Sequence, residues 1–213
     1  MSQTASNIVD INRAQTISEV DTFTVERYQQ FARHLPAGAR SVMDVGCGVG
    51  RGGQALKSFN PALEIIGMDC VPERIEKLDK SVYARGLCAF TTDIGAPDKS
   101  FDAIVAGEFL EHLPPSQVDA TLAAFFRVLR LRGRLLMTTP NPHFLLHKLK
   151  GESVLLEESH LTQHYPDCLA LRMRMVGFSR IKIYGSGKAS RYFGQHFPIR
   201  SVYGSYLIYG DKW

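Results

Sequence analysis

The sequence has few cysteines, and none of them forms a pair of the kind used for metal binding. Cys47, Cys70, Cys88 and Cys168 are scattered along 213 residues, without any Cys-x-x-Cys spacing. This spacing does not favour a metal site, and a chain of this length can bury enough apolar surface to fold without disulfide bonds. We therefore expect free thiols in a reducing compartment and no bound metal.

Long apolar stretches and long basic stretches are missing as well. No apolar run is long enough to cross a bilayer, and Met1 to Ala14 lack the apolar core of a secretory leader. The formal net charge is only +4, which permits an anionic substrate or surface but does not require nucleic acid. We therefore expect a cytoplasmic protein with no integral membrane segment.

The rest of the composition is typical of a globular protein. Hydrophobic residues make up 45% and charged residues 22% of the sequence, and no repeat, low-complexity tract or linker interrupts it. We expect one domain over residues 21–213, preceded by an arm of residues 1–20. Strands and helices alternate in the predicted order, which indicates a parallel sheet with helices on both faces.

The expected elements follow from hydrophobic periodicity and from glycine and proline breaks. Strands are expected over 41–45, 63–69, 88–92, 101–106, 135–139, 178–184 and 202–209. Helices are expected over 21–34, from the glycine-rich turn to 59, from 72 to about 85, from a cap at Ser116 to 129, and over 161–176, with a turn at 132–134. The last two strands indicate an antiparallel hairpin.

One stretch, VMDVGCGVGRGG from Val42 to Gly53, carries the strongest functional signal. An apolar run ends in a cluster of glycines and continues into a predicted helix, which is the layout of a nucleotide site at the carboxyl end of a parallel strand. Glycines there leave space for a ligand and allow positive φ, and the helix start offers unpaired N–H groups.

Two glycine spacings can be recognised in this stretch. Gly48-x-Gly50-x-x-Gly53 fits the dinucleotide fingerprint, whereas Asp44-x-Gly46-x-Gly48-x-Gly50 places a carboxylate before the first glycine. A carboxylate suits a ligand with an amino group and a sulfonium, because it would repel a pyrophosphate in a partly dry site. We therefore favour the second spacing and keep an NAD-dependent oxidoreductase as an alternative.

The second spacing resembles the first motif of the class I S-adenosylmethionine-dependent methyltransferases, (D/E)-x-G-x-G-x-G. The segment EFLEHL at residues 108–113 is similar to a segment of the ubiquinone-biosynthesis methyltransferases and their small-molecule relatives. The resemblance implies a single Rossmann-like α/β domain whose seven strands have the order 3-2-1-4-5-7-6, the last of them antiparallel. It also implies S-adenosylmethionine as cofactor and S-adenosylhomocysteine as product.

The resemblance further implies which residues bind the cofactor. Asp69 would accept hydrogen bonds from the ribose hydroxyls, although a helix cap before Pro72 or an NAD ribose would also account for it. Asp93 would accept from the adenine amine. The implied cofactor-binding residues are Asp44, Gly46, Cys47, Gly48, Gly50, Asp69, Cys70, Val71, Asp93, Ile94 and Glu108.

The acceptor is less defined by the sequence. Positioning carries much of the rate of methyl transfer, but an oxygen acceptor can require a base to remove its proton. His112, His160 and His164 are candidate catalytic residues, with His143 and Glu111 as further options. The alternative is that these side chains are packed or solvent-exposed without a chemical role.

The expected activity is methylation of a small molecule, most readily at oxygen, with amphiphilic, quinone-like and glycan metabolites as candidate acceptors. No Asn-Pro-Pro-Tyr or Pro-Cys motif follows the fourth strand, so we expect no nucleic-acid partner. Residues 142–150 are apolar with interspersed basic residues, which fits either contact with a membrane or amphiphile or a lid packed on the sheet. A cofactor-binding module without turnover is a further alternative.

Overall fold

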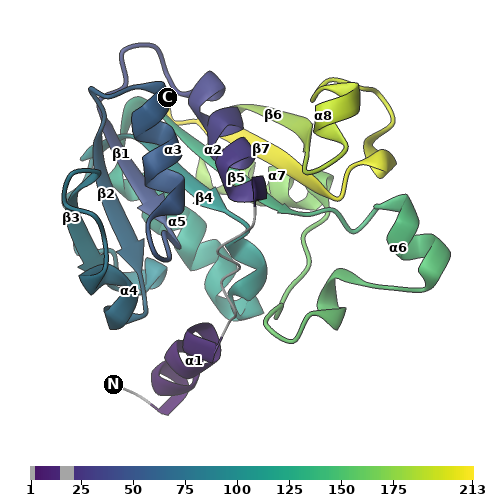
Figure 1. The fold of residues 1–213 in the computed structure, drawn as a ribbon, viewed down its shortest axis with the longest axis horizontal. Coiled ribbons are helices and arrows are strands. Elements are labelled where there is room, and N and C mark those ends of the chain that lie inside the picture. The colour runs from purple at the N-terminus through teal and green to yellow at the C-terminus, as the bar shows by residue number, and fades with distance from the viewer. Residues whose placement is uncertain (1–2, 15–21) are drawn as a thin grey trace.

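The computed structural model describes residues 3–14 and 22–213, and a seven-stranded sheet forms its centre (Figure 1). The strand order is β3-β2-β1-β4-β5-β7-β6, and β7 runs antiparallel to both β5 and β6. This confirms the expected order and the reversed last strand. The strands are β1 (Ser41–Val45), β2 (Glu64–Asp69), β3 (Tyr83–Cys88), β4 (Phe101–Gly107), β5 (Leu129–Pro140), β6 (Ser179–Ser186) and β7 (Ser205–Asp211).

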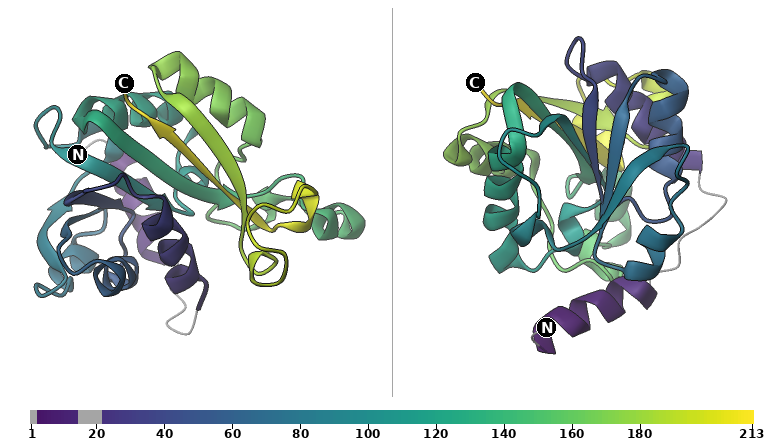
Figure 2. Two further views of the ribbon diagram at one scale, coloured as in Figure 1. Left: turned by 90° about the horizontal axis from the view of Figure 1, so that it is seen from above. Right: turned by 90° about the vertical axis from the view of Figure 1, so that its left-hand side faces the viewer.

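Helices cover both faces of the sheet, as Figure 2 shows. Alternate strand residues point to opposite faces, so Val42 and Val105 pack towards α2 and α3, whereas Met43 and Ile104 pack towards α5 and α7. The helices are α1 (Gln3–Ala14), α2 (Thr22–His34), α3 (Arg51–Phe59), α4 (Pro72–Glu76), α5 (Val118–Val128), α6 (Leu145–Lys150), α7 (Pro166–Val176) and α8 (Ser190–Phe193). Among the described helices, none has both the length and the apolar character of a membrane span.

The third strand is displaced from its expected position. We expected a helix from 72 to about 85 and a strand over 88–92, but α4 ends at Glu76 and β3 begins at Tyr83. The side chain of Tyr83 is buried against Gly53 and Gly67, which fixes this segment beside β2. Asp93 consequently lies in a 3-10 turn, Thr91–Asp93, rather than at a strand end.

Three further boundaries differ from the expectation. The expected turn at 132–134 is a bulge within β5, whose pairing with β4 skips from Leu129 to Arg134. Helix α5 begins at Val118 after a 3-10 turn, so Ser116 is not its cap. Helix α7 begins at Pro166 rather than 161, because proline fits the first helical position.

The prediction that residues 142–150 pack on the sheet as a lid is wrong. Helix α6 projects away from the sheet (Figure 1) and contacts the 3-10 turn Arg200–Val202. Leu145, Leu146 and Leu149 are 47%, 52% and 73% exposed. Part of the expected arm, residues 3–14, forms helix α1, and the expected boundary at residues 20 and 21 lies outside the described residues.

Candidate functional site

The glycine loop after β1 is built from left-handed turns. Gly46, Gly48 and Gly50 have φ of +66°, +54° and +92°, a region of backbone conformation that residues other than glycine rarely adopt. The N–H groups of Gly46 and Cys47 donate to the carbonyl of Met68 at 2.8 and 3.1 Å, which ties the loop to β2. A Cβ at Gly46 would lie 2.8 Å from the Phe109 ring, so this turn is also closely packed.

Asp44 lies near the end of β1, before this loop, and is connected to it through buried tyrosines. Its side chain is fully buried, and its two oxygens accept hydrogen bonds from the hydroxyls of Tyr28 (2.5 Å) and Tyr83 (2.6 Å). Burial raises the pKa of Asp44 to about 6, and the two tyrosine hydrogen bonds act in the opposite direction. Asp44 does not line the pocket described below, so the predicted contact between its carboxylate and the cofactor stays a prediction.

The last two glycines of the motif make room for these tyrosines. A Cβ at Gly52 would lie 2.2 Å from the Tyr28 ring, and one at Gly53 would lie 2.3 Å from the Tyr83 ring. We expected the glycines to leave space for a ligand, but at these two positions the space is filled by the tyrosines. Close packing of a helix on a strand is also the role of the third glycine in the dinucleotide fingerprint, so Gly53 does not separate the two spacings.

A pocket opens at the carboxyl ends of β1, β2 and β4. Of the predicted site residues it is lined by Gly46, Asp69, Cys70, Glu108 and His112. The lining also includes residues that the sequence did not single out: Ile8, Asn12, Arg74, Ala89, Phe90, Thr91 and Phe109. Thus the structure brings together five of the predicted residues from three separate segments.

Other predicted residues lie beside the pocket or away from it. Val71 and Ile94 are each 2% exposed, and Ile94 belongs to the core between the sheet and α5. Asp93 is exposed in its 3-10 turn. The residues that follow β3 along the pocket are Ala89 to Thr91, because β3 ends earlier than expected. Cys47, Gly48 and Gly50 form the loop without lining the pocket.

Asp69 connects the glycine loop to the start of α4. One carboxylate oxygen accepts from the Val71 N–H (2.9 Å), and the other accepts from the Gly48 N–H (3.1 Å) and lies 3.5 Å from Arg74. Asp69 thus fixes both backbone segments that border the pocket. A ribose diol that binds this carboxylate would compete with Arg74 and the backbone N–H groups.

Helix α1 covers the mouth of the pocket. Arg74 donates to the backbone carbonyl of Asn12, and Arg13 pairs with Glu73 at 3.1 Å. With Ile8 and Asn12 in place the cavity measures about 90 Å³. Small-molecule sites are typically about 300–1,000 Å³, so an adenosyl cofactor fits these residues only if α1 moves.

Two glutamates follow β4, and Glu108 of these two lines the pocket. Glu108 has φ of +49°, an unusual value for a residue with a side chain, and its carboxylate lies between Arg27 (3.7 Å) and Ser205 (3.2 Å). Glu111 is fully buried and accepts from the Thr139 hydroxyl at 3.0 Å. One oxygen of each glutamate is buried without a hydrogen-bond partner among the described residues. Burial and the nearby Glu108 raise the pKa of Glu111, which favours its neutral form.

The structure brings two of the candidate histidines together. His112 bonds through Nδ1 to the carbonyl of Ser159 at 3.0 Å, and its ring centroid lies 5.0 Å from that of His160. Burial lowers the pKa of His112, so its imidazole is neutral at pH 7. Glu111, His112 and His160 present ligand atoms within 4.8 Å of one another and could hold a metal ion. The prediction of no bound metal therefore stays a prediction.

The other histidines lie elsewhere. His164 is buried beside Thr162, with Nε2 2.9 Å from the threonine hydroxyl, and lies before α7 rather than within the helix expected over 161–176. His143 packs against the ring of Tyr165. Neither of these two histidines lines the pocket at the carboxyl ends of β1, β2 and β4.

Comparison with known proteins gives consistent likenesses. A family described as "Methyltransferase domain" matches residues 42–133. The chain is 31% identical over 145 residues to a ubiquinone biosynthesis O-methyltransferase of Xanthomonas axonopodis pv. citri (64% of this chain, 59% of that protein). It is 31% identical over 130 residues to a fatty-acid O-methyltransferase of Mycolicibacterium smegmatis (59% of this chain, 46% of that protein). The chain thus spans about half the length of these relatives.

A solved structure supports the fold. A SAM-dependent methyltransferase from Archaeoglobus fulgidus superposes with a TM-score of 0.70 at 19% identity, covering 88% of this chain and 92% of that one. The strand order and the motif from Asp44 to Gly50 point the same way. The matched family, the relatives and the fold together support a class I S-adenosylmethionine-dependent methyltransferase, similar over part of its length to the ubiquinone-biosynthesis O-methyltransferases.

Proposed function

We propose that this protein transfers a methyl group from S-adenosylmethionine to an oxygen atom of a small molecule. The observation that carries the proposal is the pocket at the ends of β1, β2 and β4, where Gly46 and Asp69 meet Glu108 and His112. A cofactor cradle and a group of proton-binding side chains thus share one cavity. Both relatives described above are named as O-methyltransferases, which supports oxygen as the acceptor atom.

In this proposal the glycine loop and Asp69 bind the cofactor. The Gly46 turn faces the amino-acid end, Asp69 accepts from the ribose hydroxyls, and Ala89 to Thr91 border the adenine. The bound cofactor supplies a methyl group on a sulfonium, already activated for transfer. Helix α1 closes over the cofactor and excludes water from the site.

His112 and Glu108, which line the pocket, would bind the acceptor. His112 is neutral because burial lowers its pKa, so it can accept the proton of an acceptor hydroxyl. The Ser159 carbonyl 3.0 Å from Nδ1 fixes the orientation of the ring. The Glu108 oxygen beside Arg27, which has no hydrogen-bond partner among the described residues, would accept a hydrogen bond from the acceptor and hold it beside the cofactor.

The NAD-dependent alternative lacks comparable support. The pocket is bordered by the carboxylates of Asp69 and Glu108. A diphosphate would be repelled there.

Calorimetry tests the proposal directly. We expect S-adenosylhomocysteine to bind and NAD not to bind. We expect Asp69→Ala to weaken the binding of S-adenosylhomocysteine at least tenfold. Asp79→Ala is the matched control, since Asp79 is an exposed carboxylate outside the pocket. Binding of NAD, or equal affinity of both variants and the wild type, would contradict the cofactor assignment. Mass spectrometry after incubation with a set of hydroxylated acceptors then separates turnover from binding alone.

A further inference from the structure

We propose that the acceptor is a single-chain amphiphile with an anionic group, bound in two adjoining compartments between α2, α6 and α8. This inference rests on the proposed function, since it names the class of molecule that the same site methylates. The compartments lie beside the cofactor pocket and are separate from it.

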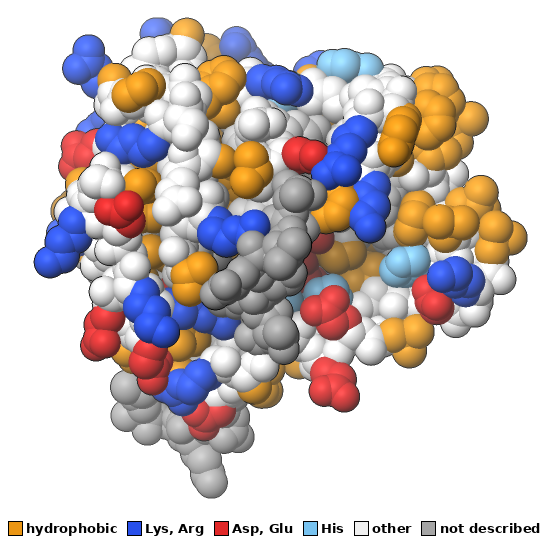
Figure 3. Space-filling model, in the orientation of Figure 1, with side chains coloured by type: hydrophobic (Ala, Val, Ile, Leu, Met, Phe, Trp, Pro, Cys, Tyr) orange, Lys and Arg blue, Asp and Glu red, His pale blue; other side chains and the backbone are white. Residues whose placement is uncertain are grey.

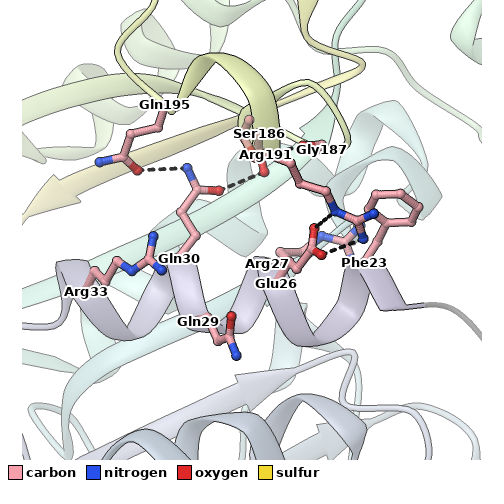
Figure 4. A pocket seen from close by; sticks show the side chains of 12 residues that line it. Phe23, Glu26, Arg27, Gln29, Gln30, Arg33, Ser186, Gly187, Arg191 and Gln195 are labelled. Atoms are coloured by element: carbon pink, nitrogen blue, oxygen red, sulfur yellow. Dashed lines mark hydrogen bonds and ion pairs between the residues drawn. The ribbon is translucent and has the colours of Figure 1, made fainter.

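The first compartment is polar and positively charged. It has a volume of about 430 Å³ and lies between α2 and the segment from Ser186 to Gln195 (Figure 4). Arg27 and Arg33 of α2 and Arg191 of α8 line it, against one carboxylate in its lining, that of Glu26. Glu26 is paired with Arg191 and Glu108 lies 3.7 Å from Arg27, so the three arginines of the lining face two carboxylates and leave one positive charge in excess.

The second compartment is apolar. It has a volume of about 650 Å³, within the range of about 300–1,000 Å³ that is typical of small-molecule sites. Apolar side chains from α6, α8 and the 3-10 turn Arg200–Val202 form most of its wall: Phe144, Leu145, Leu146, Tyr192, Phe193 and Val202. Figure 3 shows apolar side chains gathered over α6 and α8, with Lys and Arg side chains along their border.

The two compartments share a wall and adjoin the catalytic group. Phe23, Arg27 and Gly187 line both, so one molecule can occupy both at once. The Arg27 side chain crosses Gly107 at the end of β4 and lies 3.7 Å from Glu108, which lines the cofactor pocket. Ser205 lines the apolar compartment and donates to the other oxygen of Glu108 at 3.2 Å.

Charge and shape together select the occupant. A hydrocarbon chain in the apolar compartment buries the exposed side chains of Leu146 and Phe193, which are 52% exposed each. An anionic group in the polar compartment satisfies Arg27 and Arg33. Atoms between head and chain then lie at Arg27, next to Glu108 and the site of transfer. A neutral amphiphile would leave the cationic compartment unmatched.

The test is direct binding of dodecanoate, used below its micelle concentration, to protein saturated with S-adenosylhomocysteine. A calorimetric titration with S-adenosylhomocysteine, run first, measures binding at the cofactor site independently. We expect dodecanoate to bind at least tenfold more tightly than dodecanol, because dodecanol has the chain without the charge.

Two variants and their matched controls locate the ligand. Arg27→Gln should weaken dodecanoate about tenfold, since it removes a charge-assisted hydrogen bond, and Arg174→Gln on the exposed side of α7 should not. Leu146→Asp should weaken dodecanoate about tenfold, whereas Met175→Asp, at an 81% exposed position, should leave it unchanged.

Three results would overturn the inference. If S-adenosylhomocysteine binds but dodecanoate does not, the acceptor assignment is wrong and the proposed function stands. The same holds if dodecanol binds equally well, or if the protein binds phosphatidylglycerol vesicles but not monomeric dodecanoate, which would make this face a membrane contact. If S-adenosylhomocysteine also fails to bind, the proposed function fails, and this inference fails with it.

Discussion

Replacing Tyr83 with Phe tests the link between the buried carboxylate and the glycine loop. The Tyr83 hydroxyl donates to Asp44 at 2.6 Å and accepts from the Gly53 N–H at 2.9 Å. The substitution keeps the ring that packs against Gly53 and Gly67 and removes only these two hydrogen bonds. It leaves a buried carboxylate oxygen and a buried N–H without that partner.

The magnitude follows from the chemistry of the two bonds. A hydrogen bond to a charged group contributes about 1.5–3 kcal/mol and a neutral one about 0.5–1.5 kcal/mol, so the expected loss is about 3 kcal/mol at pH 8. For a chain of 213 residues this corresponds to a fall in melting temperature of roughly 6–12 °C.

The loss should depend on pH with a defined sign. The pKa of Asp44 is about 6, so at pH 5 the carboxyl is mostly protonated and the bond to Tyr83 is no longer charge-assisted. The destabilisation should then fall to about 1–2 kcal/mol. Differential scanning calorimetry at both pH values measures it, with Tyr192→Phe as control because Tyr192 is 82% exposed. An equal effect of both substitutions, or a larger loss at pH 5 than at pH 8, would refute the reasoning.

Three further predictions concern the same site. The folded-state pKa of Asp44 is raised from 3.8 to about 6, so this group makes the fold less stable as the pH rises from about 4 to 6, and stability should increase by about 2 kcal/mol as the pH falls from 7 to 4. Urea titrations should show that Asp44→Asn lacks this increase, and parallel curves for both proteins would contradict it. Removing residues 1–14 should raise the association rate of S-adenosylhomocysteine in stopped-flow experiments, because α1 narrows the pocket to about 90 Å³; an unchanged rate argues against a cover. His112→Gln should lower kcat/KM about 100-fold, and the wild-type acid limb should lie below pH 6.5, since burial lowers the pKa of His112; an unaltered pH profile in the variant excludes it as the base.

The sequence alone predicted the parts of the fold that depend on local patterns. Strands β1 and β4 are short apolar runs bounded by turn residues, and their expected bounds agree with the structure to within one residue. The left-handed turns at Gly46 and Gly50 follow directly from the glycine motif. The order of the sheet came from the resemblance to a family, because periodicity does not determine strand order.

The parts that were missed depend on contacts between distant residues. Strand β3 is positioned by Tyr83, whose partner Asp44 lies 39 residues earlier, and no local pattern marks that pairing. The polar compartment joins Glu26 to Arg191, which are 165 residues apart. The contact of α1 with the pocket depends on a backbone carbonyl at Asn12, which the side-chain pattern cannot reveal.

The most direct test of the whole account is a crystal structure grown with S-adenosylhomocysteine. We expect the ligand in the pocket that Gly46 and Phe109 line, with its ribose hydroxyls on Asp69 and its sulfur facing Glu108 on the side of Arg27. Helix α1 should be shifted from its present contact with Arg74. Ligand bound elsewhere, or a sulfur turned away from Glu108, would contradict the account.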